Sequence, residues 1–299
     1  MTLPQLQPRI EELQCLSSAG LHRMAYKEWG SRDNPEILIC VHGVTRVADD
    51  FDALAQALGH DFRVICPDVV GRGRSGHLRN PALYQIPQYV SDMVSLIARV
   101  TAHAPQPRVH WLGTSMGGLI GFGLASLPES PLASMLVNDV GPSLNFEAVA
   151  RIADYIGQDP VFPDFAAGLA YVRTVSQSFG AHTDAQWEKM ARDVLRQQPD
   201  GTWRKHYDVR LAQTFKNLTQ ESAEQGEAML WAAWDAIRCP TLLVRGAQSD
   251  LLTLETARAM CERGPRPRMI ELPEVGHAPT FVHADQIAIA QEFFLSQKK

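Results

Sequence analysis

Residues Arg108–Gly118 of this 299-residue chain read R-V-H-W-L-G-T-S-M-G-G and carry the strongest indication of its fold. Its apolar first half, Arg108–Leu112, predicts a buried strand, and the small residues after Gly118 predict a helix. Between them, Gly113-Thr-Ser115-Met-Gly117 has the G-x-S-x-G spacing of a sharp turn that lifts a serine hydroxyl above a sheet. The glycines are required because a Cβ would clash in so tight a turn. We therefore predict that Ser115 is a nucleophile.

The alternation of strand and helix continues on both sides of this stretch. Continuous apolar runs are typical of parallel strands that are buried on both faces. We expect strands at Leu21–Trp29, Glu36–Val41, Phe62–Cys66, Arg108–Leu112, Met135–Val137, Pro240–Arg245 and Arg268–Leu272. Apolar residues at helical spacing predict helices at Asp50–Leu58, Val90–Val100, Leu254–Arg263 and Asp285–Ser296. This order implies βαβ units and an α/β fold.

The alternation stops in the second half of the chain. Residues 145–238 contain helical segments but no convincing buried strand, so we predict a helical insertion there. The core would then consist of residues 1–144 and 239–299. Trp231 and Trp234 lie three residues apart on one helix face of the insertion. Either they pack the helices together or they line an apolar substrate pocket, and both remain candidate pocket residues.

A serine nucleophile needs a base, and that base is usually a histidine oriented by a carboxylate. His277 follows the last predicted strand, at the sheet edge where open α/β sheets gather their ligands. Two aspartates compete for the orienting role. Asp250 is favoured because it fits the order serine, acid, histidine with a loop of normal length. Asp139 also follows a strand, and we expect it to hydrogen-bond the turn that leads into the insertion.

Acyl transfer also needs N–H donors that stabilise the negative charge on the former carbonyl oxygen. One donor should be the backbone N–H of Met116, directly after the nucleophile. The second should come from the loop after Glu36–Val41, and we assign it to Val44 because Gly43 lets the backbone bend toward the site. We expect His42 to be a structural histidine, hydrogen-bonded behind this loop.

Composition excludes several classes of protein. The chain is 45% hydrophobic and 20% charged, as globular proteins usually are. A net charge of −5 argues against nucleic-acid binding and against a polybasic membrane contact. Val109–Pro128 has no charge, but its five glycines favour a strand, turn and helix over a membrane span. Five widely separated cysteines give no disulfide framework. Met1–Leu13 has no apolar signal-peptide core, so we expect a cytoplasmic protein.

No cofactor or metal is expected. The run Gly71-Arg-Gly73-Arg-Ser-Gly76 matches the G-x-G-x-x-G pattern of dinucleotide sites. However, His77–Pro81 follows it and is no helix start, which such a site requires. The histidines show no close pairing of the kind that binds zinc. Hydrolysis by a serine, a histidine and an aspartate needs only water.

The motifs together resemble those of the α/β-hydrolase fold superfamily. His42-Gly43, Asp68-x-x-Gly71-x-Gly73-x-Ser75, Gly113–Gly118, Ser249-Asp250 and Gly276-His277 occur in the order seen there, from about residue 20 to the end. The resemblance is to the group of small bacterial esterases, lactonases and carbon–carbon bond hydrolases. It implies an eight-stranded, mostly parallel sheet flanked by helices, with a helical lid between strands six and seven.

The expected function is hydrolysis of a small carboxylic ester or lactone through an acyl-enzyme on Ser115. Epoxide hydrolases and haloalkane dehalogenases carry Asp at this position, which disfavours both. One alternative is a carbon–carbon bond hydrolase of ring-cleavage products that uses the same three residues, although Ala278 stands where those enzymes often have an aromatic residue. A second alternative is an inactive member of the fold that binds a ligand. The expected partner is a small molecule, and a homodimer is possible.

Overall fold

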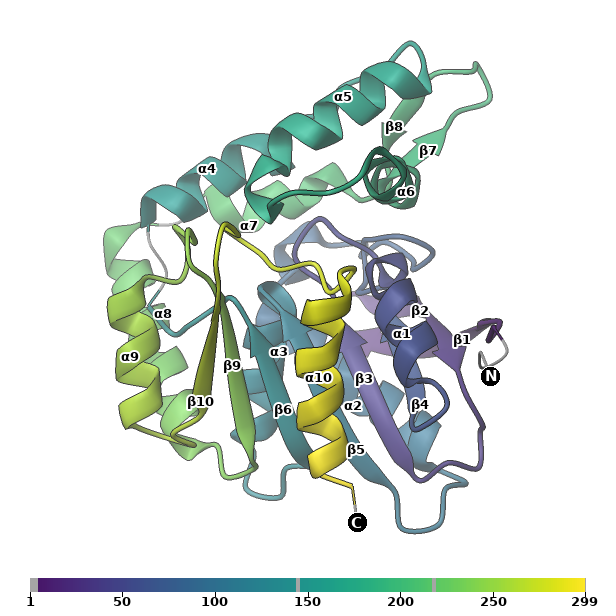
Figure 1. Ribbon diagram of the computed structural model, residues 1–299. Coiled ribbons are helices and arrows are strands. Elements are labelled where there is room, and N and C mark those ends of the chain that lie inside the picture. The colour runs from purple at the N-terminus through teal and green to yellow at the C-terminus, as the bar shows by residue number, and fades with distance from the viewer. Residues whose placement is uncertain (1–4, 144–145, 217–218, 299) are drawn as a thin grey trace.

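A computed structural model describes residues 5–143, 146–216 and 219–298. The predicted boundary between core and insertion, at residues 144 and 145, lies outside the described residues. Eight strands form one sheet in the order β1-β2-β4-β3-β5-β6-β9-β10, with helices on both faces (Figure 1). The expected α/β-hydrolase architecture, with an eight-stranded and mostly parallel sheet, is confirmed.

The sheet is parallel except at one edge. β1 (Arg9–Ser17) pairs antiparallel with β2 (Gly20–Trp29), which pairs antiparallel with β4 (Arg63–Pro67). The parallel strands that follow are β3 (Glu36–Val41), β5 (Arg108–Thr114), β6 (Leu132–Asn138), β9 (Thr241–Gly246) and β10 (Arg268–Leu272). Every residue of β3, β4 and β9 is buried, as continuous apolar runs imply for a sheet covered on both faces. β1 was not predicted, because its sequence is neither a continuous apolar run nor a strict alternation: Glu11-Glu12 and Cys15-Leu16 both interrupt the two-residue period.

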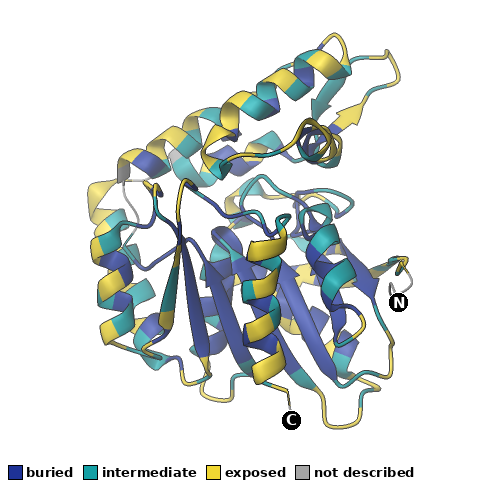
Figure 2. Cartoon of the chain, viewed as in Figure 1, coloured by how far each residue is buried: buried dark blue, intermediate teal, exposed yellow. Residues whose placement is uncertain are grey.

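Each face of the sheet has its own hydrophobic core. On one face, the short helix η1 (Ala48–Phe51), α1 (Asp52–Leu58) and α10 (Ala284–Ser296) cover side chains such as Leu38 and Val64. On the other face, α2 (Ile86–Thr101), α3 (Met116–Ala125) and α9 (Leu254–Glu262) cover side chains such as Ile39 and Val137. Figure 2 shows the buried strands between these layers. Within the described residues, the helices are too short or too polar to cross a lipid bilayer.

A largely helical segment is inserted between β6 and β9. It consists of α4 (Phe146–Ile156), α5 (Phe165–Val175), η3 (Gln177–Phe179), α6 (Asp184–Val194), β7 (Leu195–Gln197), β8 (Trp203–Lys205), η4 (Val209–Ala212) and α7 (Gln213–Lys216). Figure 1 shows these elements above the carboxyl ends of the parallel strands. The two short strands were not expected from the sequence. They pair antiparallel with each other, and Trp203 of β8 also pairs with Phe162.

The last helix of the predicted insertion belongs to the layers that cover the sheet. α8 (Gln220–Ala236) packs against α3, where the rings of Trp234 and Phe122 meet edge to face at 5.1 Å. Trp234 is fully buried in the same core as α2 and α3. The segment that lies above the sheet therefore ends before α8, about twenty residues earlier than the sequence pattern indicated.

Candidate active site

The sharp turn predicted at Ser115 is present between β5 and α3. Ser115 has φ 52° and ψ −116°, which places its side chain at the carboxyl end of the sheet. A Cβ on Gly117 would lie 2.1 Å from the carbonyl oxygen of Val41, and a Cβ on Gly113 would lie 2.3 Å from the carbonyl oxygen of Gly117. Glycine at these two positions lets the first turn of α3 pack directly against the backbones of β3 and β5.

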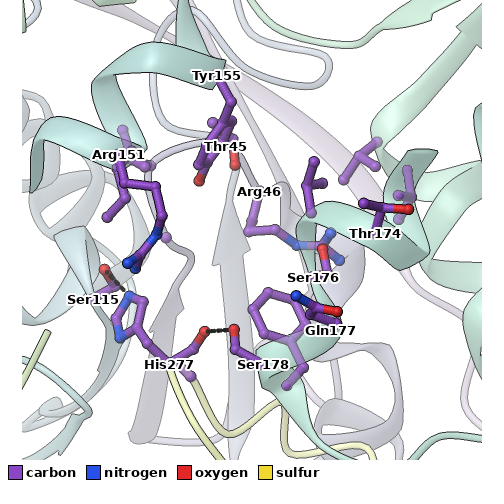
Figure 3. A pocket seen from close by; sticks show the side chains of 18 of the residues that line it. Thr45, Arg46, Ser115, Arg151, Tyr155, Thr174, Ser176, Gln177, Ser178 and His277 are labelled. Carbon is purple, nitrogen blue, oxygen red and sulfur yellow. Dashed lines mark hydrogen bonds between the residues drawn. The ribbon is translucent and has the colours of Figure 1, made fainter. Parts of the chain in front are cut away.

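Three side chains from distant segments meet in a hydrogen-bonded row at this edge. Ser115 Oγ lies 2.9 Å from His277 Nε2, and His277 Nδ1 lies 2.7 Å from Asp139 Oδ2. Figure 3 shows the contact between Ser115 and His277. The imidazole donates Nδ1–H to the carboxylate, which leaves Nε2 as the acceptor for the serine proton. Asp139 is completely buried and Ser115 is largely buried, so little water competes for these bonds.

The expectation that Asp250 orients His277 is wrong. The Asp250 side chain is 48% exposed and pairs with Arg151, Oδ2 to Nη2 at 2.5 Å. Asp139 takes the place beside His277 because it directly follows β6, which lies next to β9 in the sheet. The end of β9 and the loop after it contribute donors instead of the acid. The N–H of Gly246 donates to Asp139 Oδ1 at 2.9 Å, and the Ser249 hydroxyl donates to Oδ2 at 2.7 Å.

The two backbone positions predicted to stabilise an oxyanion lie beside Ser115. Met116 is the first residue of α3, where N–H groups have no partner within the helix. The Gly43-Val44 loop passes close by, since a Cβ on Gly43 would lie 3.7 Å from Ser115 Cβ. Arg72 supports this loop from behind: it is 1% exposed, and its Nε donates to the Val44 carbonyl oxygen at 2.8 Å.

His42 is a structural histidine, as predicted. Its Nδ1–H donates to the carbonyl oxygen of Gly43 at 2.7 Å, and its Nε2 accepts the N–H of Val69 at 3.0 Å. Burial lowers the pKa of His42 to about 4, so the ring is neutral near pH 7. It ties the Gly43-Val44 loop to the loop after β4.

Two further residues hold the His277 loop and were missed by sequence reasoning. Ser178 lies in η3 of the insertion. Its carbonyl oxygen accepts the N–H of Gly276 at 2.7 Å. Its Oγ donates to the carbonyl oxygen of His277, also at 2.7 Å. Asn138, at the end of β6, donates from Nδ2 to Thr114 Oγ1 at 2.9 Å and to the Pro279 carbonyl oxygen at 2.8 Å. Neither residue belongs to a local motif, because its partners come from remote segments.

A cavity of about 600 Å³ lies between this row and the insertion, a volume typical of ligand pockets. Figure 3 shows Ser115 and His277 at one side of the cavity, Arg151 and Tyr155 of α4 above them, and Thr174 of α5 at the opposite side. Apolar and aromatic lining residues from the insertion are Ile152, Tyr155, Tyr171, Val172, Val175, Phe179, Val194, Leu195 and Tyr207. Charged lining residues are Arg46, Arg151, Lys205, Asp154 and Asp250. The cavity therefore combines an apolar surface with an excess of cationic groups.

The two tryptophans predicted as candidate pocket residues lie elsewhere. Trp234 is buried against α3, and its indole N–H donates to the carbonyl oxygens of Met260 and Arg263, each at 3.2 Å. Trp231 lies under the Arg263 guanidinium, 4.4 Å from it, and donates to Ser143 Oγ at 3.0 Å. Both residues are on α8, which covers the sheet, so the reading that they pack helices together is correct.

One group of potential metal ligands exists among the described residues, away from this cavity. The donor atoms of Cys15, His22 and Asp92 lie within 4.8 Å of one another. His22 Nε2 is bonded to Asp92 Oδ2 at 3.0 Å, and Gln88 donates to the other carboxylate oxygen. Burial and the nearby Asp92 carboxylate raise the pKa of the Cys15 thiol to about 12, whereas a metal ligand must be a thiolate. The group suits internal hydrogen bonding better than a metal ion.

Comparison with known proteins gives consistent matches along the chain. The model of the alpha/beta hydrolase family matches residues 38–290. The chain is 53% identical over 290 residues to a 3-hydroxybutyrate-oligomer hydrolase of Cupriavidus necator, covering 96% of this chain and 98% of that protein. A putative hydrolase from Rickettsia typhi superposes with a TM-score of 0.86 at 26% identity, covering 97% of this chain and 100% of the other. An alpha/beta hydrolase from Novosphingobium aromaticivorans gives 0.82 at 31% identity, covering 97% and 99%.

Proposed function

The chain belongs to the alpha/beta hydrolase family and is a hydrolase that acts on ester bonds, and we propose that its catalytic residues are Ser115, His277 and Asp139, which would make it a serine hydrolase. The observation that supports this most strongly is the hydrogen-bonded row of these side chains, with contacts of 2.9 and 2.7 Å. Such a row moves a proton from the hydroxyl to the imidazole while the carboxylate stabilises the resulting positive charge.

The proposed reaction proceeds through an acyl-enzyme. Ser115 Oγ attacks the ester carbonyl carbon while His277 Nε2 takes the hydroxyl proton. The backbone N–H groups of Val44 and Met116 stabilise the oxyanion of the tetrahedral intermediate. His277 then protonates the leaving alkoxide, and the alcohol departs. In the second half, His277 takes a proton from water while the water oxygen attacks the acyl carbon. His277 then returns this proton to Ser115 Oγ as the Oγ–acyl bond breaks, which frees the carboxylic acid and restores the serine hydroxyl.

We further propose that the substrates are short linear esters of small hydroxy acids, of the kind named in the Cupriavidus necator relative. The cavity supports this substrate class, because its apolar and tyrosine-lined walls suit short aliphatic chains and its cationic residues suit a carboxylate end group. The elements from α4 to η4 would act as a lid that limits the length of the bound chain, since they supply most of the cavity wall opposite Ser115.

The test of the proposed catalytic residues is the Ser115→Ala variant, assayed with a short p-nitrophenyl ester. Loss of the nucleophile should lower kcat/KM by at least ~10³-fold, the scale at which such residues act. An unchanged far-UV circular dichroism spectrum would show that the variant is folded. Turnover within about tenfold of the parent rate would reject the assignment. The substrate class is tested by comparing a 3-hydroxybutyrate dimer with a ring-cleavage vinylogous diketone, which the carbon–carbon hydrolase alternative requires.

A further inference from the structure

The three cationic side chains of the cavity differ in how firmly they are held. Arg46 donates from Nε and Nη2 to the two carboxylate oxygens of Asp50, at 2.8 and 2.6 Å. The two side chains are only 12% and 18% exposed. A two-point ion pair shielded from water is strong and fixed in geometry. Arg46 is therefore committed to Asp50 and is poorly placed to exchange partners.

Lys205 is also committed. Its Nζ donates to the carbonyl oxygens of Tyr155 and Gln158, at 2.6 and 2.9 Å, and to the Tyr207 hydroxyl at 2.9 Å. These three acceptors use all three ammonium protons. A substrate carboxylate would have to displace one of them. Burial also lowers the pKa of Lys205 to about 8, so its charge is partly lost in mildly alkaline solution.

Arg151 is the cation of this cavity that can change partners. It stands on α4, and Figure 3 shows its guanidinium directed toward Ser115 and His277. Its contact with Asp250 is a pair between side chains that are 60% and 48% exposed. Ion pairs that are this exposed contribute little free energy, because water solvates both partners. A guanidinium has five N–H donors in a planar fork that matches a carboxylate, so a stronger two-point contact is open to it.

We propose that Arg151 binds the carboxylate of an anionic ester substrate, and that Asp250 orients Arg151 until this carboxylate displaces it. The inference rests on the proposed function. In an ester of a 3-hydroxy acid, the free carboxylate of the alcohol portion stands one methylene group beyond the carbon that bears the ester oxygen. A cation beside the nucleophile therefore matches the carboxylate next to the bond that is cleaved. The enzyme would then remove single units from the carboxyl end of an oligomer.

The same ion pair would also join the insertion to the loop after β9. In the competing interpretation, the pair of Arg151 and Asp250 acts only as a latch that holds these two segments together. The two interpretations predict different results when the partners are changed one at a time. A latch is broken equally by either change, and the effect does not depend on the charge of the substrate. For a carboxylate anchor, removal of Arg151 removes the binding group, whereas removal of the Asp250 charge removes its competitor. The two changes then act in opposite directions on an anionic substrate.

The experiment compares Arg151→Gln and Asp250→Asn in full-length protein at low ionic strength. The substrates are the linear dimer of 3-hydroxybutyrate as its free carboxylate and the methyl ester of the same dimer. The readout is the ratio of kcat/KM for the carboxylate to kcat/KM for hydrolysis of the internal ester in the methyl ester. Arg151→Gln should lower this ratio at least about tenfold, chiefly through KM, the scale of a lost charge-assisted contact. Asp250→Asn should raise it about two- to fivefold.

Two further variants sharpen the comparison. Arg151→Lys keeps the positive charge but loses the planar pair of donors that matches a carboxylate. Its ratio should therefore lie between those of the parent and of Arg151→Gln. Arg173→Gln is the matched control, because Arg173 is an insertion arginine whose partner is Asp184 and which does not line the cavity. This variant should leave the ratio unchanged.

The inference is overturned if Arg151→Gln and Asp250→Asn change the ratio in the same direction, or if neither changes it. Failure of the proposed function would look different. In that case, hydrolysis of the methyl ester would not depend on Ser115. If hydrolysis of the methyl ester depends on Ser115 but the ratio is unchanged in Arg151→Gln, the serine mechanism stands and only the carboxylate anchor is rejected.

Discussion

Asp139 and His277 are 138 residues apart in the chain, yet Asp139 Oδ2 lies 2.7 Å from His277 Nδ1. Asp139 follows β6 and His277 follows β10, so the two loops meet across the end of β9, which lies between these strands. The N–H of Gly246, the last residue of β9, donates to the same carboxylate. The sheet order therefore places the acid, the histidine and a fixed donor together.

Replacement of Asp139 is expected to affect catalysis far more than replacement of Asp250. An asparagine at position 139 removes the negative charge and no longer fixes the histidine tautomer, so kcat should fall about 10³- to 10⁴-fold. Asp250→Asn, which changes an exposed carboxylate, should cost less than about tenfold on p-nitrophenyl acetate. Steady-state kinetics of both variants at pH 7.5 make the comparison. The reverse order of effects would restore Asp250 as the acid.

Ser178 is expected to act on catalysis through the position of His277. Ser178→Ala removes the hydroxyl that donates to the His277 carbonyl oxygen at 2.7 Å, so the imidazole is held less firmly. We expect kcat to fall about tenfold, with KM within about twofold. Ser178→Thr keeps the hydroxyl and should restore most of the rate.

A purely structural role for Ser178 would give another pattern. It would lower Tm but leave kcat unchanged below the unfolding transition. Scanning calorimetry together with the rate of Ser115 phosphonylation separates the two, because that rate reports directly on how well His277 accepts the serine proton.

Gly117 and Gly226 are both helical glycines and should respond oppositely to an added methyl group. A Cβ at Gly117 would lie 2.1 Å from the carbonyl oxygen of Val41, so Gly117→Ala forces α3 away from β3. We expect a loss of several degrees in Tm and loss of ester hydrolysis. A Cβ at Gly226, in α8, meets nothing within 4 Å. Gly226→Ala should therefore stabilise the protein by up to ~1 kcal/mol, since alanine favours helix. An active and stable Gly117→Ala variant would contradict the tight packing of the turn.

His42 should make stability fall in mild acid. Its pKa is lowered by burial from 6.5 to about 4 in the folded protein. Between these values the unfolded chain binds a proton that the folded chain does not, so the free energy of unfolding decreases as pH falls from about 6.5 to about 4. The contribution reaches up to about 3 kcal/mol.

The check is urea denaturation of the parent and of His42→Gln between pH 7 and pH 4. Glutamine keeps an acceptor for the Val69 N–H but does not titrate in this range. The variant should be less stable at pH 7 and lose less stability toward pH 4. Parallel curves for the two proteins would contradict a neutral buried His42.

Much of the fold was predictable because most of its strands are specified by the residues of the strand itself. The boundaries of β3 and β10 match the predicted Glu36–Val41 and Arg268–Leu272. In β3 the signal is one continuous apolar run, and in β10 it is a short apolar segment that only Glu271 interrupts. The turn at Ser115 was predictable for the same reason, because five consecutive residues specify it. β1 was not predicted because it is an edge strand in which exposed residues alternate with partly buried ones, while its polar and apolar residues do not follow that alternation strictly.

The site was predictable only where one segment decides it. Asp139 and Asp250 both follow strands in the order that the mechanism requires, and only their three-dimensional neighbours distinguish them. Ser249 and Gly246 turn one carboxylate toward His277, whereas Asp250 is exposed beside Arg151. The tryptophans of α8 could not be placed, because an amphipathic helix packs equally well on a lid or on a sheet. Ser178 carried no signal, since its contacts join two remote loops.

The most direct test of the central claim is reaction with an active-site fluorophosphonate, followed by peptide mass mapping. A hydroxyl activated by His277 and Asp139 forms a covalent phosphonyl adduct, with fluoride as the leaving group. We predict one adduct per chain, on Ser115, formed at least about a hundredfold more slowly in Asp139→Asn than in the parent. An unmodified Ser115, or equal labelling rates in the two proteins, would contradict the account.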